Sequence, residues 1–307
     1  MAEIRNISII GLGALGVLYG NYFTKALGRE AVSFVADQTR IKKYQEQGVY
    51  CNGQKCDFPF TDGSEVERPA DLFLFAVKAG ALSDAIAASK NLIDPDTIIL
   101  SVLNGISSEA IIGEAFGQAH LLYCIAQGMD AVKLGNQLTY SHIGQLCIGV
   151  PENEPEKLPM LLAVMELFDK IQLPYTKEAD IRHRLWSKWM LNVGVNQVVM
   201  VYEGTYGTVQ QEGTPREMMK AAMREVIALA EKEQVPVTEE DLNSYLALMD
   251  TLSPDGMPSM RQDGIAKRNS EVELFAGTVI RESEKHGLDA PVNKELYHMV
   301  KKLEAEY

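Results

Sequence analysis

The chain has 307 residues, of which 46% are hydrophobic and 23% are charged, as is typical of soluble globular proteins. This length is enough for about two domains. The formal net charge of −13 argues against nucleic acids and anionic membranes as partners, so any anionic ligand must be held by a local basic site.

The cysteines and the first apolar run bear on the cellular compartment. None of the cysteines forms a Cys-x-x-Cys pair, so we expect reduced thiols in a cytoplasmic protein. Residues 7–23 are apolar but too short to cross a membrane, and they lack the basic leader and cleavage site of a secretion signal. The cysteines are Cys51, Cys56, Cys124 and Cys147.

The first predicted strand, residues 7–10, runs into a Gly-x-Gly-x-x-Gly loop. In a dinucleotide-binding unit Gly11 allows the sharp turn, Gly13 lets the backbone approach a pyrophosphate, and Gly16 lets the next helix pack closely. A glycine-rich turn without a ligand is the alternative, but the strand before the loop and the apolar helix after it favour nucleotide binding. The predicted cofactor loop is Gly11, Leu12, Gly13, Ala14, Leu15 and Gly16.

The next elements alternate between apolar strands and helices. This alternation predicts a parallel sheet with helices on both faces, a doubly wound, Rossmann-like α/β domain. The segment 137–150 is more typical of antiparallel strands. The predicted strands are 31–36, 71–77 and 97–103, and the predicted helices are 41–47, 82–90, 109–116 and 158–171.

Nearly everything after residue 178 has a helical pattern. Capping signals mark helix starts at Thr214 and Thr238, and another at Ser259 predicts a long helix toward His286. Pro291 begins the last predicted helix. We therefore predict a dinucleotide-binding Rossmann domain at 1–178 and an all-α substrate and catalytic domain at 179–307.

One predicted helix carries a polar stripe. Lys188, Asn192 and Asn196 have i, i+4, i+8 spacing, which places an ammonium and two amides on one side of an otherwise apolar segment. The stripe is either a solvated face or a substrate-facing one. In an apolar pocket the lysine pKa falls, which makes the ammonium a usable proton donor.

Two polar residues follow buried strands. Lys78 ends the strand at 71–77 and Asn104 follows the strand at 97–103, where ligands of open α/β sheets bind. The alternatives are a solvated strand end for Lys78 and a type I′ or II turn for Asn104 with Gly105.

Five segments, in order, carry a resemblance that covers nearly the whole chain: GLGALG, DLFLFAVKAG, LNGISSE, WSKWMLNVGVNQ and SMRQDGIAKRNSEVE. Together they resemble the ketopantoate reductase family, the 2-dehydropantoate 2-reductases. The resemblance implies a Rossmann domain and a helical domain with the active site in the cleft between them. It also implies NADPH-dependent reduction of ketopantoate to pantoate in pantothenate biosynthesis, with a small 2-keto acid as partner.

The resemblance also implies roles for individual residues. Lys188 matches the catalytic lysine that protonates the ketone oxygen, and Glu271 matches a catalytic acidic residue. Spacing alone would place Glu271 on a solvated face and make Ser259 the cap of its own helix. The remaining matches are Lys78 on the cofactor side, Asn104 near both nicotinamide and substrate, Asn192 and Asn196 for the substrate, and Ser259 for its carboxylate.

The end of the second strand departs from the family pattern. Asp37 stands where many members have a basic residue for the 2′-phosphate of NADP. An acidic residue there normally accepts from the ribose 2′-OH of NAD. Arg40, or Lys42 and Lys43, could still reach a 2′-phosphate, so we expect NADP first, with NAD as the alternative.

Two further departures concern the substrate pocket. Gln197 replaces a frequent proline, and Tyr206 replaces an asparagine in the following loop. Both leave room for a different 2-keto acid, so a D-2-hydroxyacid (mandelate-type) dehydrogenase is the first alternative. A nucleotide-binding sensor without catalysis is the second. The apolar helices of the C-terminal half fit either a homodimer face or a core.

Overall fold

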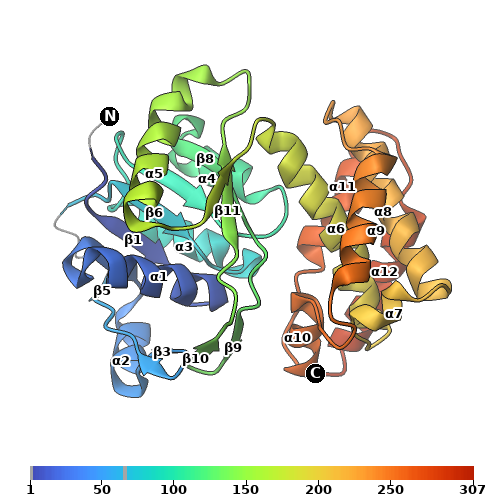
Figure 1. Ribbon diagram of the computed structural model, residues 1–307, viewed down its shortest axis with the longest axis horizontal. Coiled ribbons are helices and arrows are strands. Elements are labelled where there is room, and N and C mark those ends of the chain that lie inside the picture. Colours follow the sequence, from blue (N-terminus) through green and yellow to red (C-terminus); the bar gives the residue numbers. More distant parts are fainter. Residues whose placement is uncertain (1–2, 65–67) are drawn as a thin grey trace. The chain divides into compact units, whose positions relative to one another are not determined.

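The computed structural model describes residues 3–64 and 68–307 and divides the chain into two compact units, Met1–Ile181 and Arg182–Tyr307 (Figure 1). The division falls three residues after the boundary expected at 178. The assignment of cofactor binding to one domain and substrate binding to the other stays a prediction.

The N-terminal unit is built on an eight-stranded sheet with the order β12-β11-β8-β7-β6-β1-β2-β5. Neighbours from β8 to β5 are parallel, as predicted, while β11 is antiparallel to β8 and parallel to β12. The strands are β1 Ile7–Ile10, β2 Val32–Val35, β5 Phe60–Thr61, β6 Leu72–Phe75, β7 Ile98–Ser101, β8 Leu121–Gln127, β11 Gln145–Gly149 and β12 Tyr175–Lys177.

Helices cover both faces of this sheet because successive strand residues point to opposite sides. Ile9, Leu74 and Leu100 pack in one core cluster with side chains of α1 and α5. Phe73 and Ile99 pack in a second cluster with α3 and α4. The helices of this unit are α1 Ala14–Leu27, α2 Gln38–Gln47, α3 Leu82–Ser89, α4 Ser108–Phe116 and α5 Leu158–Ile171.

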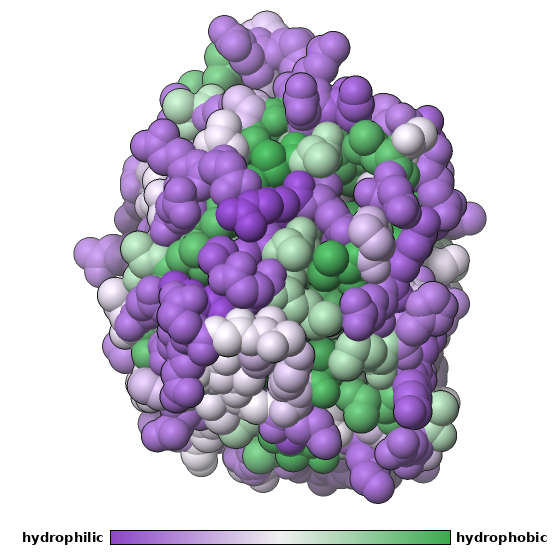
Figure 2. Space-filling model, turned by 90° about the vertical axis from the view of Figure 1, so that its right-hand side faces the viewer, coloured by the Kyte–Doolittle hydropathy of each residue, from purple (hydrophilic) through white to green (hydrophobic). Residues whose placement is uncertain are grey.

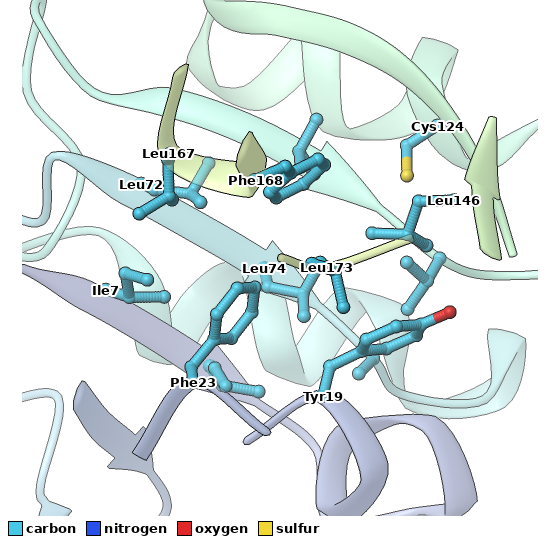
Figure 3. Close-up of a cluster of buried hydrophobic side chains, with 14 of the residues drawn as sticks. Ile7, Tyr19, Phe23, Leu72, Leu74, Cys124, Leu146, Leu167, Phe168 and Leu173 are labelled. Atoms are coloured by element: carbon cyan, nitrogen blue, oxygen red, sulfur yellow. The ribbon is translucent and has the colours of Figure 1, made fainter. Parts of the chain in front are cut away.

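The core under α1 and α5 is aromatic. Figure 3 shows Phe23 of α1 and Phe168 of α5 among Ile7, Leu72 and Leu74 of the strands. The two rings are stacked with centroids 6.5 Å apart. This packing fixes α1, and with it the glycine loop that precedes α1.

Short elements complete the unit. A small sheet, in the order β4-β3-β10-β9, joins segments that are distant in sequence. Within it β10 is parallel to β3 and antiparallel to β9. The bounds are β3 Tyr50–Cys51, β4 Gln54–Lys55, β9 Val132–Leu134 and β10 Gln137–Thr139, with 3-10 turns η1 Arg29–Ala31, η2 Ala79–Ala81, η3 Gln118–His120 and η4 Pro155–Lys157.

The C-terminal unit is helical, as predicted. Its first helix, α6, begins at the last residue of the N-terminal unit. The elements are α6 Ile181–Val201, α7 Tyr206–Gln210, α8 Thr214–Lys232, α9 Glu239–Thr251, α10 Ser259–Ile265, the π-helical turn η5 Glu273–Gly277, α11 Thr278–Lys285 and α12 Pro291–Glu304.

The structure tests the predicted helix starts and caps of the C-terminal unit. The capping box of Thr238 with Asp241 and the start at Pro291 are confirmed. The starts at Thr214 and Ser259 are also confirmed, but their capping role is wrong, because each is the first residue of its helix and neither helix has a side-chain cap. The long helix expected after Ser259 is also wrong, because the chain leaves α10 with Lys267 in a left-handed conformation (φ 49°).

The described part of the chain has the mixed polar and apolar surface that its composition suggests. Within the described ranges, no helix combines the length and apolarity that crossing a membrane requires. On the face drawn in Figure 2, hydrophobic residues lie in small groups separated by hydrophilic ones.

Candidate functional site

The glycine loop between β1 and α1 has little room for side chains. Gly11 has a φ of 103°, and a Cβ added there would lie 2.6 Å from the carbonyl oxygen of Ala76. A Cβ on Gly16 would overlap the carbonyl oxygen of Gly11. These two glycines are therefore required by the protein itself, for the turn and for helix packing.

Gly13 differs from its neighbours. It is the N-cap of α1, and the only described atom within 4 Å of an added Cβ is the Ala76 carbonyl oxygen, 3.6 Å away. The first turn of α1 has no acidic residue, and its N-cap makes no side-chain hydrogen bond. The helix N-terminus thus suits an anion, and the protein leaves the space next to Gly13 open on the side where a Cβ would lie.

The predicted strand-end residues share one edge of the sheet. Asp37, Lys78 and Asn104 follow β2, β6 and β7, which with β1 form the adjacent parallel strands β7-β6-β1-β2. The chain winds away from β1 in both directions here, and such a switch point is where open α/β sheets bind ligands.

Asp37 is the N-cap of α2. Its Oδ1 accepts from the backbone N–H of Arg40 at 2.8 Å, and its Oδ2 lies 3.5 Å from Arg40 Nε. Both side chains are more than half exposed, at 57% and 62%. A carboxylate and a guanidinium are therefore presented together after β2, one suited to a ribose hydroxyl and the other to a phosphate.

Asn104 stands in the turn between β7 and α4 and is half-buried. Gly105 has a φ of 93° and Asn104 has no positive φ, which excludes the type I′ turn and fits type II. The exposed Lys78 precedes η2, and its carbonyl accepts from Ala81 N–H at 2.9 Å.

A buried polar chain lies beneath the Asn104 turn. Ser101 Oγ accepts from Leu103 N–H at 3.3 Å and pairs with Ser108 Oγ at 2.8 Å, and Ser108 Oγ donates to Glu109 Oε2 at 2.9 Å. Burial raises the pKa of Glu109 to about 7, against hydrogen bonds that lower it. The sequence gives no sign of this chain, because a glutamate in the first turn of a helix, as Glu109 is in α4, is ordinarily exposed.

In the C-terminal unit the predicted polar stripe is partly buried. Lys188 and Asn192 are half-buried, and Asn196 is 5% exposed. Asn196 Nδ2 donates to Asn192 Oδ1 at 3.2 Å. The stripe is therefore not a simple solvated face.

Ser259 joins this stripe from a distant segment. Its Oγ and the backbone N–H of Met260 both donate to Asn196 Oδ1, each at 3.2 Å. The structure thus brings Asn192, Asn196 and Ser259 together. Glu271 is half-buried and lies just before η5.

The two departures expected in the substrate pocket have different surroundings. Gln197 is fully buried, at 0% exposure. Tyr206 is half-buried at the start of α7. Its N–H donates to the Gly256 carbonyl at 2.9 Å, and its ring would lie 2.8 Å from a Cβ added on Gly256.

The fold and these residues define a class of protein, the nicotinamide-dependent oxidoreductases. Residues 7–153 match the family model "Ketopantoate reductase PanE/ApbA", and residues 180–304 match "Ketopantoate reductase PanE/ApbA C terminal". The chain belongs to the ketopantoate reductase family. It is an oxidoreductase that acts on the CH–OH group of a 2-hydroxy acid.

Curated relatives align over nearly the full length. The 2-dehydropantoate 2-reductase of Vibrio cholerae is 26% identical over 305 residues, covering 98% of this chain and 99% of that one. The enzyme of the same name from Aquifex aeolicus is 24% identical over 303 residues, covering 97% and 96%.

Solved structures share the fold. A PanE/ApbA family ketopantoate reductase from Ralstonia eutropha has a TM-score of 0.83 at 22% identity, covering 98% of this chain and 99% of that one. A D-mandelate dehydrogenase in complex with NADH has a TM-score of 0.85 at the same identity and coverage. A dimeric ketopantoate reductase from Staphylococcus aureus has a TM-score of 0.79 at 19% identity, covering 98% and 99%.

Proposed function

We propose that this chain is a 2-dehydropantoate 2-reductase that uses NADPH to reduce ketopantoate to pantoate. The observation that carries the proposal is the hydrogen-bonded group of Asn192, Asn196 and Ser259 beside Lys188 on α6. These amide and hydroxyl groups suit the hydroxyl and carboxylate of a small hydroxylated keto acid. The full-length similarity to enzymes of that name supports the same substrate.

The residues divide the chemistry between them. A reduced nicotinamide, when bound, supplies a hydride to the C2 carbonyl carbon of the keto acid. Lys188 stabilises the negative charge that develops on the carbonyl oxygen and donates the proton to that oxygen. The substrate is held and oriented by Asn192, Asn196 and Ser259. Glu271 is the acidic residue of the proposed site.

The N-terminal unit would hold the cofactor. The N-terminus of α1, next to Gly13, would bind the pyrophosphate of the cofactor. Asn104 and Lys78 would contact the cofactor near its nicotinamide. We propose NADP as the preferred cofactor, with Arg40 on the 2′-phosphate and Lys42 or Lys43 as further cations. Asp37 and the NADH complex of a structural relative favour NAD as the second candidate.

A steady-state comparison of substrates and cofactors tests the proposed function. We expect the highest kcat/KM for ketopantoate with NADPH, measured as loss of absorbance at 340 nm. A higher value for an aromatic or branched 2-keto acid with NADH would instead assign a mandelate-type dehydrogenase. Tight cofactor binding with no turnover of any 2-keto acid would assign the sensor.

The open space at Gly13 gives a test of the cofactor site. We expect Gly13→Ala to weaken NADPH binding by about tenfold or more, because the added methyl meets the pyrophosphate and not the protein. Fluorescence titration measures the Kd, and an unchanged Tm shows that the loop is intact. Unchanged affinity would place the pyrophosphate elsewhere.

The proposal also covers the cellular compartment and the oligomeric state. We expect a cytoplasmic enzyme, because a reductase of this kind acts on small metabolites with a diffusible cofactor. A homodimer also stays a prediction, which the dimeric relative from Staphylococcus aureus supports.

A further inference from the structure

Helix α6 carries a second line of side chains beside the polar stripe. Trp189, Val193 and Gln197 repeat the i, i+4, i+8 spacing one residue later, which is a rotation of about 100° around the helix. All three are buried, with 1%, 0% and 0% exposure. This second line faces the core of the C-terminal unit.

The second line binds the backbone of the π-helical turn η5. Trp189 Nε1 donates to the carbonyl of Leu274 at 2.9 Å. Gln197 Oε1 accepts from the N–H of Ala276 at 3.1 Å. Two side chains, two helical turns apart on α6, thus hold two peptide groups of one turn.

The bond from Gln197 explains the unusual form of η5. In an α-helix the Val272 carbonyl would accept from Ala276 N–H. Here it accepts from Phe275 N–H at 3.2 Å and from Gly277 N–H at 3.0 Å, while Ala276 N–H donates to Gln197. A side chain that enters the backbone ladder is a known cause of local helix distortion, and π-bulges are frequent at functional sites.

Gln197 is itself held in one orientation. Its Nε2 donates to the Val193 carbonyl at 2.7 Å and to Asn293 Oδ1 at 3.2 Å. Asn293 in turn donates to Glu225 Oε2 at 2.7 Å. The amide oxygen of Gln197 is therefore left to face Ala276.

Glu271 is hydrogen-bonded through its backbone to η5, the turn that Gln197 and Trp189 also bind. Its carbonyl accepts from Leu274 N–H at 2.9 Å, and Leu274 is the residue whose own carbonyl receives Trp189. A shift of η5 along α6 therefore moves the backbone of Glu271 relative to the stripe that begins at Lys188.

We propose that Gln197 is a positioning residue that sets the register of η5 on α6 and so places Glu271 for the reaction. The inference rests on the proposed function for the role of Glu271, while the register itself rests on the hydrogen bonds of Gln197. Gln197 touches neither substrate nor cofactor. Its buried amide acts through the backbone of Ala276.

Gln197→Met tests the proposal, with Asn293→Ala as the matched control. Each variant removes one fully buried amide from the same network, but only the first removes the acceptor for Ala276 N–H. In Asn293→Ala the shorter bond from Gln197 Nε2 to the Val193 carbonyl remains, which keeps the Gln197 amide oxygen toward Ala276. We expect Gln197→Met to lower kcat about tenfold or more and to alter the pH profile of kcat, with NADPH Kd unchanged. Asn293→Ala should lower Tm and keep kcat within about threefold of the wild type.

Amide hydrogen exchange at Ala276 gives a readout that does not depend on activity. Exchange should accelerate in Gln197→Met and not in Asn293→Ala. Trp189→Phe, which releases only the Leu274 carbonyl, serves if Gln197→Met fails to fold, and it should lower kcat severalfold. Normal kcat in a folded Gln197→Met, or equal losses of kcat in both amide variants, would overturn the proposal. Faster exchange at Ala276 in a protein without reductase activity would uphold the register and refute the proposed function.

Discussion

Lys188→Ala should lower kcat by at least about 100-fold, in line with the loss of a general acid. The substitution removes both the proton donor and the positive charge that stabilises the developing oxyanion. The binding of NADPH should not change, because the proposed cofactor residues lie in the other unit. Steady-state kinetics with ketopantoate and a fluorescence titration with NADPH measure the two effects.

Lys220→Ala is the control for this prediction. Lys220 is a partly buried lysine of the same helical unit, and its ammonium pairs with Glu217 at 2.7 Å on α8. Its loss should leave kcat unchanged. Near-normal turnover in Lys188→Ala would remove the lysine from the mechanism.

Glu109→Gln should stabilise the protein at about pH 8 and change little at about pH 5. Burial raises the pKa of Glu109 from its usual 4.5 to about 7, so the folded state binds the proton more tightly than the unfolded state. The free energy of unfolding therefore falls as pH rises from about 4.5 to 7, by on the order of 3 kcal/mol. Glutamine cannot ionise and keeps an acceptor for Ser108 Oγ, so it should avoid this loss.

Urea unfolding at the two pH values measures the effect. Circular dichroism is the suitable signal, because Trp186 and Trp189 both lie in the C-terminal unit. Glu114→Gln, an exposed change on the same helix α4, should alter neither value. An equal difference in stability between Glu109→Gln and the wild type at the two pH values would show that Glu109 is not buried as a carboxyl.

Local sequence patterns predicted the strands and helices that depend mainly on their own residues. The strand around residues 71–77 is continuously apolar because it is covered on both faces, and it forms β6. The helix predicted over 158–171 has the bounds of α5. The tertiary contact of Asn196 could not be predicted this way, and it takes the hydroxyl of Ser259 that a capping pattern assigns to its own helix.

The features that could not be predicted depend on contacts between residues that are distant in sequence. The π-helical form of η5 depends on Gln197, which is 79 residues from Ala276 in sequence. Of the small sheet, only β10 lies in a segment expected to form antiparallel strands, since strands of two or three residues carry no periodicity. The buried chain from Ser101 to Glu109 needed the packing of α4 before its polar groups could be seen as a unit.

The two bonds of Asp37 link the evolution of cofactor choice to the stability of a helix. Its carboxylate caps α2 and is also the group proposed to meet the ribose, so a change to alanine that removes the negative charge also costs about 1 kcal/mol of helix stability. Serine or asparagine keeps the cap and loses the charge. Lineages that exchange NADH for NADPH at this position are therefore expected to pass through those two residues, with Arg40 as the proposed partner of the phosphate.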